Sequence, residues 1–209
     1  MEQKDVIALV LLLGCAGAGL LAACLSHRIR DVLFVMLILL SAVTERVDVN
    51  FVSRDWYRGS TRGFEVSLVD VISFCLLVSA IVAPRRGERR LFWPGSLGAM
   101  LLFFGYAVFC TAIAEPKLFP MFELSKMIRG MIIFLAAAFF VRGEREVRLL
   151  VFGLGLIVAY EGLTALTQRY YYGIHRVGGT IDDPNSLSMY LCMTAPVLGT
   201  MMPPVPPTP

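Results

Sequence analysis

Long apolar blocks separated by short polar segments dominate the pattern of this chain. Within each block the apolar residues are almost continuous, and they do not form a single stripe of helical period, which is typical of helices surrounded by lipid. Most blocks have lengths of about 16 to 23 residues, which suit helices that cross about 30 Å of hydrocarbon, the shorter ones only marginally. We therefore predict an all-α protein, a polytopic transmembrane helical bundle of about seven membrane helices. The predicted blocks are residues 6–25, 31–44, 68–83, 95–114, 119–141, 149–166 and 187–202.

Composition supports the membrane interpretation. The chain is 57% hydrophobic and 17% charged, with a mean hydropathy of +0.71, whereas soluble domains carry about 25% charged residues. The net charge of +3 is too small to indicate a nucleic-acid partner. We expect residues 1–202 to form one transmembrane domain in contact with membrane lipids. The proline-rich residues 203–209 are expected to be disordered or to mark a truncation.

The metal-binding residue types are not grouped. All five cysteines lie in apolar blocks, and no CxxC pair occurs. The two histidines, His27 and His175, have no ligand spacing. We predict no metal site and no cofactor.

Arginine clusters predict the orientation. The loops 26–30, 84–90 and 142–148 hold two, four and three arginines, and we assign them to the cytoplasmic side. The loops 45–65 and 169–186 would then face outward. The bias is not clean, because the first of these outer loops also contains arginines. Arg58 and Arg62 belong to a solvated loop or contact a phosphate or a sugar.

Several charges lie inside predicted membrane segments. Glu123, Lys126 and Arg129 follow one another at intervals of three residues, near one face of a helix. Either Glu123 and Lys126 form a structural pair, or Lys126 and Arg129 line a cavity and meet phosphates. Glu161 has no evident local partner, so we expect it to face a cavity or a helix that carries a cation.

The most polar internal segment, residues 169–187, separates the last two apolar blocks. Its tyrosines and arginines suit the membrane interface. The pair Gly178-Gly179 permits a sharp turn or close approach to a ligand, and Asn185 or Ser186 can cap the next helix. The positive end of that helix, together with Arg176, would favour an anion such as phosphate. The alternative is a purely structural loop.

The residues of this segment also carry a family resemblance. Arg176, Gly179 and Thr180, followed after a short gap by Pro184-Asn185 and an apolar helix, resemble the core of the O-antigen ligase and Wzy-type polymerase superfamily. Residues 57–70 look like an outer segment of bacterial members, some of them linked to exopolysaccharide or exosortase loci. The family consists of multi-pass proteins of the bacterial inner membrane.

The resemblance implies a reaction and a set of site residues. Members transfer a glycan from undecaprenyl pyrophosphate to a lipid A core, another glycan or a protein, without a metal. Arg176 would be the catalytic residue that stabilises the pyrophosphate leaving group. The residues expected to bind the donor or to shape its site are Lys126, Arg129, Glu161, Gly179, Asp183, Asn185, Arg58 and Arg62.

The resemblance also predicts what this chain lacks. Members have more membrane helices and a histidine in a later outer loop, so we expect the chain to correspond to an N-terminal half. A chain that ended at Pro209 is expected to be inactive. The other interpretations are a polysaccharide polymerase of the same superfamily, a transporter or flippase, and a non-catalytic membrane fragment.

Overall fold

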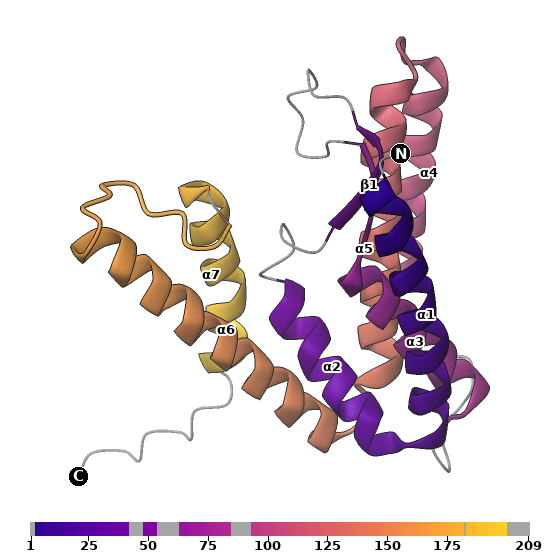
Figure 1. The fold of residues 1–209 in the computed structure, drawn as a ribbon, viewed down its shortest axis with the longest axis horizontal. Helices are drawn as coiled ribbons and strands as arrows, with labels where there is room; N and C mark the ends of the chain where they lie inside the picture. Colours follow the sequence, from indigo (N-terminus) through magenta and orange to yellow (C-terminus); the bar gives the residue numbers. More distant parts are fainter. Residues whose placement is uncertain (1–2, 42–47, 54–62, 85–92, 182, 200–209) are drawn as a thin grey trace. The chain divides into compact units, whose positions relative to one another are not determined.

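The computed structural model of this protein describes residues 3–41, 48–53, 63–84, 93–181 and 183–199 (Figure 1). The described chain is mostly helical, and each predicted apolar block corresponds to one helix, which confirms the all-α class at this level. Its elements are α1 (Gln3–Leu25), α2 (His27–Ser41), β1 (Asp48–Ser53), β2 (Gly63–Ser67), α3 (Leu68–Val82), α4 (Leu97–Ile113), α5 (Leu118–Phe140), α6 (Glu144–Tyr170) and α7 (Pro184–Gly199).

By length and composition, α6 is the one helix among the described residues that can cross a membrane. It has 27 residues, and its most apolar stretch has a mean hydropathy of 2.0. Only 17% of that stretch is buried, whereas the core helix of a soluble protein would be mostly buried. Three further segments, Leu13–Leu25, α3 and α4, are apolar but shorter. Membrane association is thereby indicated, and the number of crossings stays a prediction.

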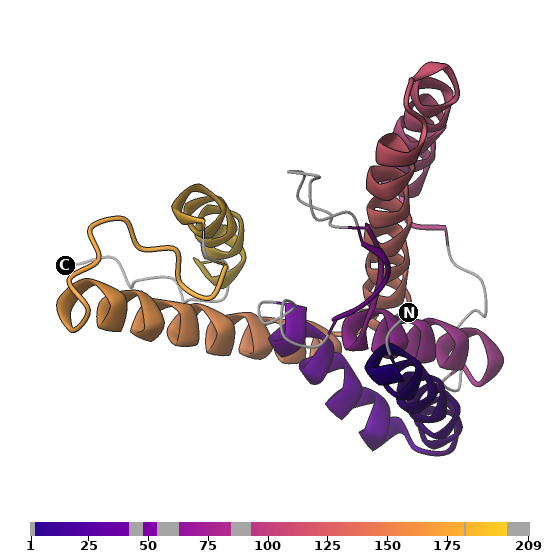
Figure 2. The same cartoon turned by 45° about the horizontal axis from the view of Figure 1, so that its top comes forward.

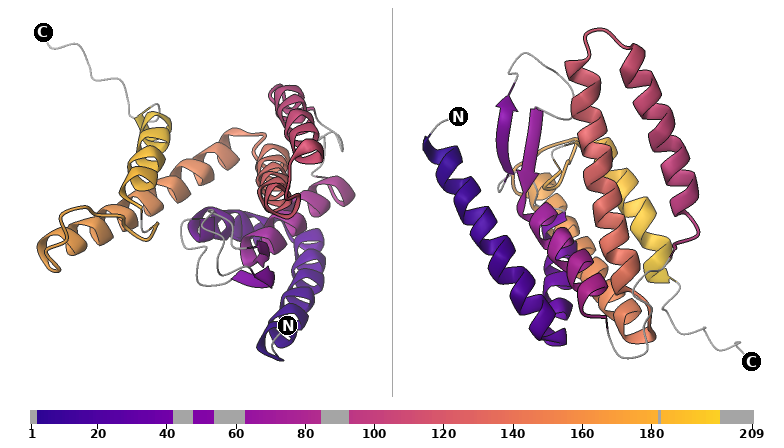
Figure 3. Two further views of the ribbon diagram at one scale, coloured as in Figure 1. Left: turned by 90° about the horizontal axis from the view of Figure 1, so that it is seen from above. Right: turned by 90° about the vertical axis from the view of Figure 1, so that its right-hand side faces the viewer.

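The chain divides into two compact units. Unit 1 comprises Met1–Phe34 and Thr44–Arg142, and unit 2 comprises Val35–Val43 and Gly143–Pro209. In unit 1, α3 packs against both α1 and α5, and α4 packs against α5 (Figures 1 and 3). The core is aromatic and aliphatic: the rings of Phe34 and Phe140 stack with centroids 4.2 Å apart, and Leu76 is fully buried.

A two-stranded antiparallel hairpin, β1–β2, stands where the sequence predicted an outer loop. Its register runs from Asp48 opposite Ser67 to Ser53 opposite Gly63, with an irregularity between Asn50 and Val52. Two such short strands are marginal on their own. The hairpin is supported because Phe64 packs edge-on against the buried Phe122 of α5, with ring centroids 5.0 Å apart. Arg58 and Arg62 lie outside the described residues.

The end of β2 passes directly into α3. Ser67 is the N-cap: its hydroxyl accepts from the Asp70 amide, at 3.3 Å, and the Asp70 carboxylate accepts from the Ser67 amide, at 2.8 Å. This reciprocal capping box satisfies two amides that the first helical turn leaves without partners. It therefore sets the point at which strand becomes helix.

Unit 2 contains α6, α7 and the second half of α2. The loop of residues 171–183, which we call the connecting loop, leaves the end of α6 and returns to the start of α7 (Figure 2). In the first half of α6, a Cβ atom on Gly153 would lie 2.9 Å from the Ile38 side chain. Glycine at this position therefore lets α6 and the second half of α2 approach closely, as small residues do between membrane helices.

Candidate functional site

The connecting loop begins by folding back onto the last turn of α6. The amides of Tyr171 and Tyr172 donate to the Thr167 carbonyl, at 2.9 and 3.2 Å, and the Ile174 amide donates to the Gln168 carbonyl, at 3.0 Å. Arg169 Nη1 lies 2.9 Å from His175 Nδ1. The residues immediately before Arg176 are thus tied to the helix.

Two side chains of α6 hold the far part of the loop. The Gln168 amide group binds Gly179 twice: Oε1 accepts from the Gly179 amide, at 3.0 Å, and Nε2 donates to its carbonyl, at 2.8 Å. Glu161 Oε2 accepts from the Thr180 amide, at 3.0 Å, and Glu161 Oε1 accepts from the Thr180 hydroxyl. Glu161 and Gln168 are seven residues apart, or about two helical turns, so they project from one face of α6.

Glu161 is fully buried within unit 2. Besides Thr180, it interacts electrostatically with Tyr190 of α7, whose hydroxyl is itself buried. The sequence predicted that Glu161 faces a cavity or a cation. Its observed hydrogen-bond partner is the connecting loop, because the loop folds down onto this face of α6. A donor-binding role for Glu161 stays a prediction.

Gly179 occupies a position where a side chain would be strained. Its φ of +63° lies in the left-handed region, where a Cβ atom costs about 1–2 kcal/mol. A Cβ atom here would also overlap Oε2 of Glu161 and would lie 3.3 Å from the Leu187 side chain of α7. Of the two uses that the sequence suggested for Gly178-Gly179, a turn and an approach to a ligand, the structure shows the turn at Gly179.

The first turn of α7 is capped by Asp183. Its Oδ2 accepts from the Ser186 amide, at 2.9 Å, and from the Ser186 hydroxyl, at 2.6 Å. The expectation that Asn185 or Ser186 is the cap was therefore wrong. Pro184 begins the helix, a position where proline needs no amide hydrogen, and this places the cap one residue earlier.

The Asp183 carboxyl has a pKa below its ordinary value. The Ser186 hydroxyl is the main cause, followed by the amides of Ser186 and Asn185 and then by the positive charge of Arg176. The start of α7 thus already holds a carboxylate of the chain itself. An anion at this place would rely on the guanidinium of Arg176 rather than on the end of the helix.

Arg176 lies between the two tied parts of the connecting loop, and its side chain is exposed. Arg176, Gly179, Asp183 and Glu161 all belong to unit 2. Glu161 lies against Gly179, and the charge of Arg176 acts on Asp183. Asn185 is exposed on the first turn of α7. An exposed guanidinium on a loop that is anchored on both sides can bind a phosphate through two parallel N–H donors.

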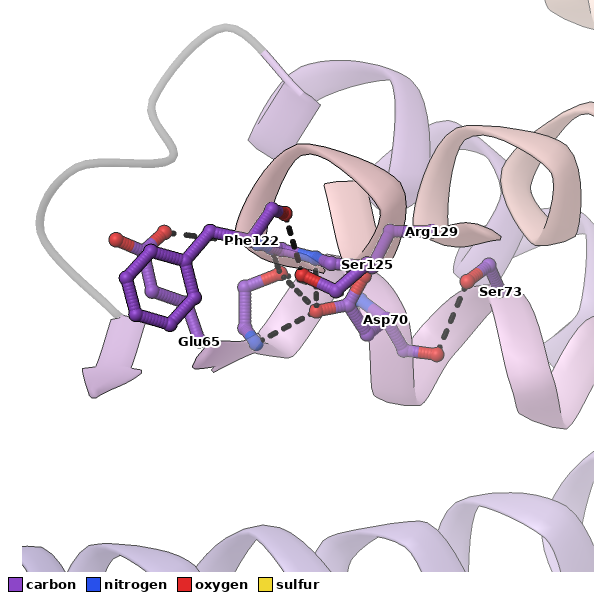
Figure 4. Close-up of polar contacts among 7 residues, drawn as sticks. Glu65, Asp70, Ser73, Phe122, Ser125 and Arg129 are labelled. Carbon is purple, nitrogen blue, oxygen red and sulfur yellow. Dashed lines mark hydrogen bonds and ion pairs between the residues drawn. The ribbon is translucent and has the colours of Figure 1, made fainter. Parts of the chain in front are cut away.

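Arg129 has a different environment, inside unit 1 (Figure 4). Its Nε lies 2.9 Å from Asp70 Oδ2, its Nη2 donates to Ser67 Oγ, at 3.0 Å, and its Nη1 lies 3.5 Å from Glu65 Oε2. The guanidinium therefore joins α5 to the junction of β2 and α3. Lys126, on the same helix, is exposed and has a partner of its own. The expectation that both bind donor phosphates stays a prediction.

Replacing Arg129 by methionine is expected to lower the free energy of unfolding by about 2–4 kcal/mol, since it leaves two mostly buried carboxylates without their cation. The side chains of Asp70 and Glu65 are only 19% and 18% exposed. The measurement is chemical unfolding of the purified protein in detergent. The control is Arg148→Ala, which breaks an exposed pair with Glu144 and should cost far less, because solvent screens such a pair. Equal losses in the two variants would contradict the structural role of Arg129.

Sequence reasoning missed Gln168, which binds the loop at two points. The signal was present, because Gln168 follows Glu161 by about two helical turns and so lies on the same face of the helix. Within the described ranges, no group of three or more His, Cys, Asp and Glu side chains is placed to hold a metal ion.

No family model, no curated protein and no solved structure matches this chain.

Proposed function

We propose that this chain is a multi-pass protein of the bacterial inner membrane that transfers a glycan from undecaprenyl pyrophosphate to a glycan, lipid or protein acceptor, as O-antigen ligases do. The observation that carries the proposal is the exposed Arg176 on a loop whose flanking residues are both hydrogen-bonded to α6. A cation on an anchored loop is suited to the charge that develops on a departing pyrophosphate.

Exposed apolar side chains support the membrane part of the proposal. On α4, the large residues Leu102, Phe103 and Phe109 are 78%, 65% and 64% exposed, and only Leu97 of that helix is buried. Leu163 on α6 is 66% exposed. Helices that present this much apolar surface need lipid or a partner around them. We infer that the shorter apolar helices also cross the bilayer.

The proposed reaction exchanges one bond at the anomeric carbon of the donor sugar for another. A hydroxyl of the acceptor attacks this carbon, the new glycosidic C–O bond forms, and the C–O bond to the pyrophosphate breaks. The hydroxyl proton passes to solvent, and undecaprenyl pyrophosphate leaves with the bonding electron pair. Arg176 would donate two hydrogen bonds to the pyrophosphate oxygens as their negative charge increases.

Deletion of the gene in the source bacterium tests the reaction class. We expect carrier-linked glycan to accumulate on the outer leaflet of the inner membrane and the acceptor to lose its glycan, with both effects reversed by the restored gene. The readout is mass spectrometry of extracted carrier lipids and of the acceptor.

The other outcomes identify the alternatives. Acceptors that carry single repeat units, with long chains absent, would indicate a polymerase. Carrier-linked glycan confined to the cytoplasmic leaflet would indicate a flippase. An unchanged distribution of glycan would overturn the proposal.

A further inference from the structure

Gln168 and Glu161 of α6 together bind three backbone polar groups of the turn at residues 179–180. These groups are the amide and carbonyl of Gly179 and the amide of Thr180. The hydroxyl of Thr180 is bound as well. A turn that contains Gly178-Gly179 resembles a phosphate-binding glycine loop, but the amides of Gly179 and Thr180 are already used inside the protein.

The negative charge of Glu161 also disfavours binding of a phosphate on the side of the turn that faces α6. The oxygen that accepts from the Thr180 amide belongs to the buried side chain of Glu161. An anion that replaced it would have to displace a group with no exposed surface. The face of the turn that meets α6 therefore anchors the loop, and a ligand has to approach Arg176 from the opposite, exposed side.

We propose that Glu161 and Gln168 are positioning residues, which act by hydrogen-bonding Thr180 and Gly179 and so hold Arg176 at the place where it meets the pyrophosphate. This inference rests on the proposed function for its consequences in catalysis, and on the hydrogen bonds alone for its structural part. It replaces substrate contact by Glu161 with an indirect role, and it adds Gln168 to the site.

The two residues differ in what they must supply, and this gives a test. Thr180 needs an acceptor for its amide and any polar partner for its hydroxyl, so Glu161→Gln keeps both hydrogen bonds. Gly179 needs an acceptor and a donor, so Gln168→Glu removes the donor and places a carboxylate oxygen against the Gly179 carbonyl. Glu161→Gln should therefore preserve the hydrogen bonds that hold the loop, and Gln168→Glu should break the one to the Gly179 carbonyl.

Transfer kinetics with the full chain in detergent or in native membranes measure the first consequence. We expect Glu161→Gln to stay within about twofold of wild type. Gln168→Glu and Glu161→Ala should lose about tenfold or more in kcat, with a smaller change in the KM for the carrier-linked donor, because a misplaced group fails mainly in the transition state. The control is Thr167→Ala, which removes an exposed hydroxyl that donates to the Leu163 carbonyl of the same helix.

Double variants separate positioning from general damage. In an Arg176→Ala background, Gln168→Glu should cause no further loss in kcat, because Gln168 acts through the Arg176 side chain, which is already absent. A further loss equal to that in the wild-type background would overturn the proposal. Glu161→Gln as inactive as Glu161→Ala would also overturn it, since the carboxylate charge would then be the essential property.

Limited trypsin digestion of the purified protein provides a readout that is independent of activity. Cleavage after Arg176, followed by mass spectrometry, should be several times faster in Gln168→Glu than in wild type, and unchanged in Glu161→Gln and Thr167→Ala. Unchanged cleavage in Gln168→Glu would overturn the anchoring itself. If Arg176→Ala remained fully active while cleavage changed as expected, the proposed function would fail and the anchoring would stand.

Discussion

Replacing Arg176 by alanine is expected to reduce glycan transfer to a small residual rate while the protein remains in the membrane at its normal level. Arg176 is exposed, so its removal empties no packed volume. Loss of one preorganised donor group that stabilises transition-state charge costs about 10²- to 10³-fold in rate. Arg176→Lys should recover part of this loss, because lysine keeps the charge but lacks the planar fork. The measurement is glycan linkage in cells that carry the substitution at the native locus.

Arg148 provides the matched control for this experiment. It is an exposed arginine near the start of α6, whereas Arg176 follows the last turn of the same helix. Arg148→Ala removes the same charge from the chain and should leave transfer within about twofold of wild type. Transfer by Arg176→Ala at the level of this control, with equal amounts of protein, would show that Arg176 does not take part in the reaction.

Gly179→Ala is expected to destabilise unit 2 by about 3 kcal/mol or more and to displace the connecting loop. The new Cβ atom requires a left-handed backbone, and it would also overlap the Glu161 carboxylate and press on Leu187. Glu161 is fully buried and cannot move into water without losing its bonds to Thr180. The measurement is unfolding of the purified protein in detergent, together with trypsin cleavage after Arg176.

Gly173→Ala is the control that separates backbone strain from the side-chain overlap expected in Gly179→Ala. Its φ is +68°, close to that of Gly179, but nothing lies within 4 Å of the position of its Cβ atom. Gly173→Ala should therefore cost only the backbone strain, about 1–2 kcal/mol. Equal destabilisation by the two substitutions would mean that the contact of Gly179 with Glu161 and Leu187 contributes nothing.

The ends of the helices differ from the ends of the apolar blocks in the sequence. The apolar block 149–166 predicted the centre of α6, but the helix extends to Glu144 at one end and Tyr170 at the other. Its polar ends are still helical because Glu144 and Glu146 suit the positive end of the helix dipole and Arg169 suits the negative end. The distribution of apolar residues alone therefore does not predict the polar turns at the two ends of the helix.

The β1–β2 hairpin could not be read from the same pattern. Its strands are short, and they lie within a segment rich in charges. The hairpin depends on the packing of Phe64 against Phe122, and these two residues are 58 positions apart in the sequence. Strand formation of this kind is decided by packing more than by intrinsic preference.

The sequence by itself determined the helical class, the place of each helix and the segment in which Arg176 lies, because helix formation in apolar blocks depends on neighbours a few residues apart. Tertiary structure alone decided the partners of the charged residues. Arg129 joins Asp70, 59 residues away, and the buried Glu161 binds Thr180, 19 residues away. A hydrogen bond requires positions correct to within a few tenths of an ångström, and only the packed helices and the folded loop provide them.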